Sequence, residues 1–298
     1  MNGIALLVML LSTALTQAEG VIVKQYGKKH KIGGMFFNAI ICAFAAVFFI
    51  VKEIVIKGEI QIPAALVPYG LVSCLMYATG FYTMYLSLQL GSFGLTRLVT
   101  SFSGIIAIFY GIFFLSEKPH FLTYIAIVLV FLSVFLMRFE DGKKEDGEGK
   151  TFSVKWLVST LLCVISNGFI AILSKAQQNA FAGECDSEFK AMSYVGAFVA
   201  LTILGFVLEK DNLPYILRHG SAYGILAGLV NGGHNLTTLI LYTLAPISVV
   251  SPMATGLGLI ASFGLSVFLY REKFTKMQGI AVAIGFAAFI LFQVASAI

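Results

Sequence analysis

The chain of 298 residues is 58% hydrophobic and only 12% charged, and its mean hydropathy is +0.91. A soluble globular domain carries about twice this charged fraction, so the composition excludes that class of protein. The formal net charge of +5 does not indicate binding to nucleic acid, because the basic residues flank apolar segments and form no patch with interleaved aromatic residues.

Apolar segments recur along the chain at the length needed to cross a bilayer. Roughly 20 mostly apolar residues make a spanning helix, because the hydrocarbon layer is about 30 Å thick and a helix rises about 1.5 Å per residue. The predicted fold class is an all-α integral membrane protein with ten transmembrane helices. In chain order, these helices are predicted at 3–23, 33–51, 65–88, 94–114, 120–138, 154–174, 190–208, 220–243, 248–270 and 277–297.

A polar stretch at residues 139–153 divides the predicted helices into two halves of five. It has no apolar period and indicates a solvated linker between a domain at 1–138 and a domain at 154–298. The first predicted helix lacks a basic leader and a small-residue cleavage site, so we interpret it as a retained helix and not as a signal peptide.

The distribution of Lys and Arg predicts the orientation of the chain. Cytoplasmic loops of membrane proteins carry an excess of these residues. The loops that follow odd-numbered predicted helices hold fourteen of them, and the opposite face holds five. We therefore expect a multi-pass protein of the cell membrane with both termini on the non-cytoplasmic face.

The two halves resemble each other at an offset of 155 residues. "LSEKPHFLTYIAIVLVFL" begins at Leu115 and "YREKFTKMQGIAVAIGFA" at Tyr270, so Glu117 aligns with Glu272, and the lysines that follow them align as well. Matches among Ile, Leu, Ala and Phe could arise from composition alone, but the Glu-Lys matches fall at equivalent loop positions. Because each copy has an odd number of helices, the repeats would be inverted, which is typical of secondary transporters that open alternately to the two sides.

The same two segments resemble the loop between the fourth and fifth helix of each repeat in EamA-type transporters of the drug/metabolite transporter superfamily. Lys24 and Lys175, at the ends of the first and sixth predicted helices, are similar to the family's terminal lysines. Ser116 and Arg271 stand where the family commonly has Gly before the Glu. The resemblance implies a ten-helix transporter of a small-molecule solute. Many relatives are described with cytoplasmic termini, unlike the orientation that the charges predict here.

Ionisable side chains within the predicted spans are candidate site residues, because a charge in a bilayer is costly and usually functional. Glu19 is the clearest. A carboxyl in a low-dielectric cavity holds its proton more tightly than in water, so Glu19 could couple transport to a proton gradient. It could equally pair with Lys24 near the helix end. Arg97 could bind an anionic group or extend to the membrane surface.

The segment "GLVNGGHNLTT" is the densest polar group in the chain. Four of its polar residues fall within one helical face about 100° wide, which we predict to face a cavity: Asn231, His234, Asn235 and Thr238. Three glycines recur every four residues beside this face and are predicted to let a neighbouring helix approach: Gly224, Gly228 and Gly232.

Further substrate-binding candidates are Tyr82, Tyr85 and Asn167. The two tyrosines belong to a stripe at helical spacing and could stack on a solute or anchor their helix at the membrane interface. Asn167 is a polar residue within the span predicted at 154–174. Hydroxyl groups could be added to the site by four further residues: Ser101, Ser103, Thr255 and Ser262. For the two loop glutamates, Glu117 and Glu272, we expect a structural role, either at helix N-termini or in pairs with Lys118 and Lys273.

These patterns predict a secondary transporter, an exporter of a small metabolite or amphipathic compound, driven by protons or by the solute's own gradient. It would act as a monomer or homodimer. The alternative is an integral-membrane enzyme that acts on a lipid-linked substrate, which would need a cluster of acids, histidines or a nucleophile that the short loops do not offer. The cysteines have no paired spacing and there is no phosphate-binding loop, so we expect no metal and no cofactor.

Overall fold

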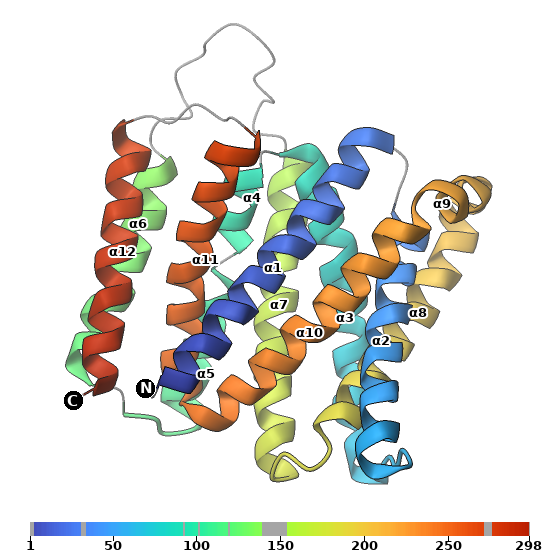
Figure 1. Ribbon diagram of the computed structural model, residues 1–298, viewed down its shortest axis with the longest axis horizontal. Coiled ribbons are helices and arrows are strands. Elements are labelled where there is room, and N and C mark those ends of the chain that lie inside the picture. The colour runs from blue at the N-terminus through green and yellow to red at the C-terminus, as the bar shows by residue number, and fades with distance from the viewer. Residues whose placement is uncertain are drawn as a thin grey trace, which may run out of the picture.

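The computed structural model describes residues 3–30, 34–91, 93–100, 102–118, 120–138, 154–270 and 276–297, and the regular structure within these ranges is helical. The first half forms α1 (Gly3–His30), α2 (Met35–Lys57), the single turn η1 (Ala64–Leu66), α3 (Val67–Leu90), α4 (Phe93–Thr100), α5 (Ser103–Phe114) and α6 (Phe121–Arg138). The second half forms α7 (Val154–Ala180), α8 (Asp186–Leu208), the turn η2 (Lys210–Asn212), α9 (Leu213–His219), α10 (Ser221–Leu244), α11 (Ile247–Tyr270) and α12 (Lys276–Ala297). The long helices lie side by side, and α1 begins on the side of the molecule on which α12 ends (Figure 1).

Each predicted span except one coincides with a single long helix. The prediction of one helix over 94–114 is wrong, because α4 ends at Thr100 and α5 begins at Ser103. Thr100, the last residue of α4, donates its hydroxyl to the Arg97 carbonyl at 3.1 Å, and such side-chain hydrogen bonds compete with those of the helix. Interrupted helices at membrane depth are tolerated where they line a cavity, so the break is a first indication of the site.

The side chains are distributed as in a membrane protein. Six of the described helices are long and apolar enough to cross a bilayer, whereas α10 is not among them because its polar face lowers its hydropathy. Large apolar side chains face outward, since Val55, Phe114 and Phe268 are 77%, 79% and 86% exposed. Lys190 and Asn231, in contrast, are buried. An apolar exterior around buried polar groups suits lipid surroundings, and the chain is a multi-pass membrane protein.

Helices of the first half pack against helices of the second half. α2 lies against α8 and α6 against α12, while α1 crosses α10 and α3 lies against α7 (Figure 1). One buried cluster joins α2, α3 and α8 around Phe49, Tyr77 and Tyr194. A second joins α1, α5 and α11 around Met9, Ala107 and Met253.

The glycine ridge predicted on α10 is confirmed, and α2 is the helix that packs on it. A Cβ atom added to Gly224 or Gly232 would lie 2.7 or 2.8 Å from a side chain of α2. At Gly228 it would lie 2.5 Å from the backbone oxygen of Ile41. Glycine therefore permits backbone-to-backbone contact at this crossing, as small residues do between membrane helices.

Glu117 stabilises a helix of the opposite half. Its carboxylate oxygens accept hydrogen bonds from the backbone N–H groups of Ile247 (3.2 Å) and Ser248 (2.9 Å), at the N-terminus of α11. The expected role at a helix N-terminus is therefore confirmed for Glu117, while Glu272 lies outside the described residues. Ser116 has a φ of 54°. This left-handed conformation favours glycine, which explains why similar transporters commonly have Gly before the Glu.

We expect Glu117→Ala to lower the free energy of unfolding by about 1–2 kcal/mol, because it removes the cap and the negative charge at the α11 N-terminus. Thermal unfolding of the purified protein in detergent measures the effect. Lys118→Ala is the matched control, since Lys118 is exposed in the same loop and should leave the unfolding temperature unchanged. Equal unfolding temperatures for Glu117→Ala and the wild type would contradict the assigned role.

Candidate functional site

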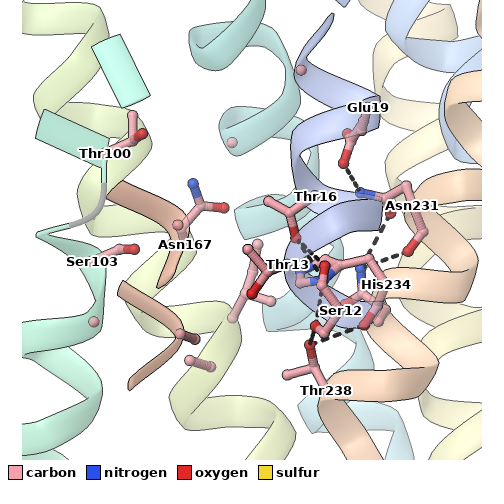
Figure 2. A pocket seen from close by; sticks show the side chains of 18 of the residues that line it. Ser12, Thr13, Thr16, Glu19, Thr100, Ser103, Asn167, Asn231, His234 and Thr238 are labelled. Atoms are coloured by element: carbon pink, nitrogen blue, oxygen red, sulfur yellow. Dashed lines mark hydrogen bonds between the residues drawn. The ribbon is translucent and has the colours of Figure 1, made fainter. Parts of the chain in front are cut away.

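A cavity of about 320 Å³, lined by both polar and apolar side chains, lies between the two halves of the chain. Its lining comes from α1, α3, α4 and α5 of the first half and from α7, α8, α10 and α11 of the second. Thr100 and Ser103, on either side of the break between α4 and α5, line one wall, and Asn167 of α7 lies beside them (Figure 2). The opposite wall is built by α1 and α10 (Figure 2).

His234 is held at the crossing of α1 and α10. Its Nδ1 atom lies 2.7 Å from Thr16 Oγ1 and 3.0 Å from Ser12 Oγ. The Thr16 hydroxyl donates a hydrogen bond to the Ser12 carbonyl at 2.9 Å. The Thr16 oxygen can therefore accept a hydrogen bond from His234 Nδ1–H. Thr238, one turn further along α10, bonds Ser12 as well, at 3.3 Å (Figure 2).

A chain of hydrogen bonds runs from Lys190 of α8 through two asparagines of α10 to Glu19 of α1. Lys190 Nζ donates to Asn235 Oδ1 at 3.1 Å, and Asn235 Nδ2 donates to Asn231 Oδ1 at 3.2 Å. Asn231 Nδ2 then donates to Glu19 Oε2 at 2.9 Å (Figure 2). Every donor points from the lysine toward the carboxylate, an arrangement in which successive hydrogen bonds strengthen one another.

Tyrosine hydroxyls fix the orientation of both asparagine amides. Tyr77 donates to Asn235 Oδ1 at 2.7 Å, and Tyr194 donates to Asn231 Oδ1. Each of these Oδ1 atoms therefore accepts from a hydroxyl group as well as from a nitrogen of the chain, which leaves each Nδ2 atom as the donor.

Arg97 reaches the cavity from α4 across α1. Its Nη2 atom donates to the backbone oxygen of Thr16 at 2.9 Å. A Cβ atom added to Gly20 would lie 1.9 Å from that Nη2 atom, so only glycine at this position leaves room for the guanidinium. Of the two roles considered for Arg97, extension to the membrane surface is excluded in this conformation, because the side chain lines the cavity.

The comparisons with known proteins agree with this architecture. Residues 3–139 match the model of the EamA-like transporter family. The first half of the chain belongs to that family. The family is part of the drug/metabolite transporter superfamily, so the protein is a membrane transporter with a small-molecule substrate. A solved structure, titled only as a crystal structure of a protein, is similar over 99% of this chain and 98% of its own, with a TM-score of 0.70 at 11% identity. No curated protein matched the chain.

Six of the eight predicted site residues line one cavity: Glu19, Arg97, Asn167, Asn231, His234 and Asn235. Thr238 lines it too, so the predicted polar face of α10 does look into a cavity. Three of the four residues proposed to add hydroxyls also line it, namely Ser103, Thr255 and Ser262, while Ser101 lies outside the described residues. Lys24, which we considered as a partner for Glu19, donates to the Gly91 carbonyl at 3.2 Å.

The structure does not bring Tyr82 and Tyr85 to the cavity. Tyr85 is buried in a cluster with Tyr26 and Phe37, and Tyr82 packs against the cluster of α2, α3 and α8. The face of α3 that lines the cavity instead carries Tyr77, Gly80, Phe81, Met84 and Leu88. The two tyrosines do lie on one side of α3, but that side packs against other helices and does not line the cavity.

Sequence reasoning missed Lys190, Tyr77 and Gln17 as site residues. Gln17 joins α1 to α11, because Ser262 Oγ donates to its Oε1 at 2.9 Å and its Nε2 donates to the Gly258 oxygen at 3.3 Å. Lys190 is the first residue of the helix predicted at 190–208, so the charge count assigns it to the preceding loop. The acidic first turn of α8, with Asp186 and Glu188, is the N-terminal signal that would have placed it inside the helix.

Proposed function

We propose that the protein is a secondary transporter of ten transmembrane helices, which carries a small metabolite or amphipathic compound by alternating access between two inverted five-helix repeats at 1–138 and 154–298. The observation that carries this proposal is the cavity, which both halves line and which lies beside an interrupted helix. Its volume of about 320 Å³ equals that of about ten water molecules at roughly 30 Å³ each. That space suits a metabolite better than a lipid-linked substrate.

The packing pattern supports the repeats. If α1 to α3 correspond to α7, α8 and α10, and α5 and α6 to α11 and α12, the most extensive contacts between the halves have counterparts. The α1 and α10 pair corresponds to α7 and α3, and the α2 and α10 pair corresponds to α8 and α3. The α5 and α7 pair corresponds to α11 and α1, while α2 with α8 and α6 with α12 correspond to themselves. This is the pattern of a two-fold axis between the halves.

Two equivalent lysines support the same correspondence. Lys24 of α1 donates to the carbonyl of Gly91 at the end of α3, at 3.2 Å. Lys175 of α7 donates to the carbonyl of Tyr242, in the last turn of α10, at 2.8 Å. Each lysine thus stabilises a helix C-terminus, where unpaired carbonyls and the helix dipole attract positive charge. One lies near each side of the membrane, as inverted repeats require.

We further propose that Glu19 couples transport to protons and that the protein exports its solute from the cell across the cell membrane. Glu19 is the only carboxylate among the described residues that line the cavity. It bonds Asn231 of the opposite half, so a change in its protonation alters a contact between the halves. Solute movement into liposomes that contain the purified protein, compared with empty liposomes, tests whether the protein transports at all.

The inverted arrangement predicts opposite labelling of two equivalent loops. Glu59 follows α2 and Lys210 follows α8, and both side chains are exposed. In a variant without Cys42, Cys74, Cys163 and Cys185, we expect an impermeant thiol reagent to label Glu59→Cys from outside the cell and Lys210→Cys from the cytoplasm only. Lys118→Cys, after α5, is the control and should behave like Glu59→Cys. Labelling of Glu59→Cys and Lys210→Cys from the same side would rule out inverted repeats.

A further inference from the structure

Lys190 is a buried cation whose hydrogen-bond partners are all neutral. Its side chain lines the cavity, and the residue is 2% exposed. The ammonium donates to Tyr77 Oη and Ser174 Oγ, both at 2.8 Å, and to Asn235 Oδ1 at 3.1 Å. Neutral acceptors satisfy the three protons but supply no opposite charge, and a buried ion without one is costly.

The nearest carboxylates make their hydrogen bonds with other residues, and Asp186 attracts the Lys190 ammonium through space without a direct contact. Asp186, one turn before Lys190 on α8, accepts hydrogen bonds from Gln177 at 2.8 Å and Gln178 at 3.1 Å. Glu19 is reached only through the amides of Asn231 and Asn235. Within the described part of the chain, none of the ion pairs found involves Lys190.

The cavity as a whole has an excess of positive charge. Among the described residues, its lining contains two side chains that can carry a positive charge, Arg97 and Lys190, and one carboxylate, Glu19. With all three ionised and His234 neutral, the lining has a net charge of +1. An occupant with a single negative charge would balance it, whereas a cation would double the imbalance.

We propose that the transported solute is a small monocarboxylate and that its carboxylate binds Lys190. This inference rests on the proposed transport function and deepens it. The carboxylate replaces Ser174 as an acceptor for the ammonium. Ser174 also donates to the Ile170 carbonyl at 2.7 Å, so its displacement leaves no buried hydroxyl without a partner. The apolar body of the solute lies against Phe81, Met84 and Ile170 of the cavity lining.

Matched probes test the charge preference on the full-length protein in detergent. Benzoate, benzamide and benzylamine share one body and differ in charge, and hexanoate, hexanamide and hexylamine form a second series. We expect only the two carboxylates to raise the unfolding temperature in a concentration-dependent way. Stabilisation by neither carboxylate, or equal stabilisation by the amides or amines, would overturn the proposal.

Variants assign the effect to Lys190. Lys190→Gln should weaken the apparent affinity for the carboxylates by about ten- to a hundredfold, as expected for a lost charge-assisted hydrogen bond. Lys190→Arg keeps the charge and should keep the preference for carboxylates, which separates loss of the anion site from loss of fold. Lys52→Gln is the matched control: Lys52 donates to Ser187 at 2.6 Å outside the cavity, so its loss removes one charge and should leave affinity unchanged. Equal weakening in Lys52→Gln and Lys190→Gln would refute a specific site.

Proteoliposomes distinguish this inference from the proposed function on which it rests. Carboxylates that bind through Lys190 but do not cross the membrane would support the carboxylate site at Lys190 and contradict the transport function. Transport that prefers the amine or the amide would support the transport function and contradict the monocarboxylate inference.

Discussion

Proteoliposomes with an imposed pH gradient are expected to lose gradient-driven accumulation of the solute when Glu19 is replaced by Gln, while solute exchange at equal pH continues. Gln has nearly the shape of Glu, and its amide oxygen can still accept the hydrogen bond from Asn231 that Glu19 accepts at 2.9 Å. The substitution removes the titrating proton and the negative charge of the ionised form, and it keeps the hydrogen bond. Accumulation against a gradient needs that proton, whereas binding and exchange do not.

Two further variants separate titration from other effects of the substitution. Glu19→Asp keeps a carboxyl group on a shorter side chain and should retain part of the accumulation. Glu59→Gln removes a carboxylate in an exposed loop and should behave like the wild type. If Glu19→Gln accumulates solute as the wild type does, Glu19 serves only to bind Asn231, and the transporter is either a facilitator or couples elsewhere.

The sequence predicted the spanning helices because apolar side chains must face lipid over a length that the bilayer sets. The polar face and the glycine ridge of α10 could also be predicted, since both follow from helical periodicity alone. The position of Lys190 in the cavity could not be predicted, because a lysine near the end of an apolar segment has the same sequence pattern whether it faces water or a cavity. Only the packing of α8 against α2 and α3 decides between the two.

The misplacement of Tyr82 and Tyr85 has a related cause. Sequence periodicity shows that a helix has a distinct face, but not which neighbour that face meets. On α3, the aromatic face with Tyr85 packs into a cluster with α1 and α2, and the face with Tyr77 lines the cavity. Partners such as α2 with α8 are far apart in the chain, and a single sequence contains no signal for their pairing.

The same packing makes Gly228 a position where one methyl group should be severely destabilising. An added Cβ would lie 2.5 Å from the Ile41 backbone oxygen and 2.8 Å from Phe44 Cβ on α2. Backbone cannot rotate away as a flexible side chain can, so Gly228→Ala must push α10 away from α2. We expect the free energy of unfolding to fall by about 2–3 kcal/mol, measured by unfolding in mixed micelles.

Gly233 of the same helix provides the control for this substitution. There a Cβ would lie 3.4 Å from the nearest atom, the end of the Leu15 side chain. Gly233→Ala should therefore be neutral or stabilise the helix by up to about 1 kcal/mol, through the higher helix propensity of Ala. Because α10 also carries Asn231, His234 and Asn235, its displacement should reduce transport in Gly228→Ala and not in Gly233→Ala. Equal stability of the two variants would show that α2 and α10 do not cross as closely as the glycine ridge requires.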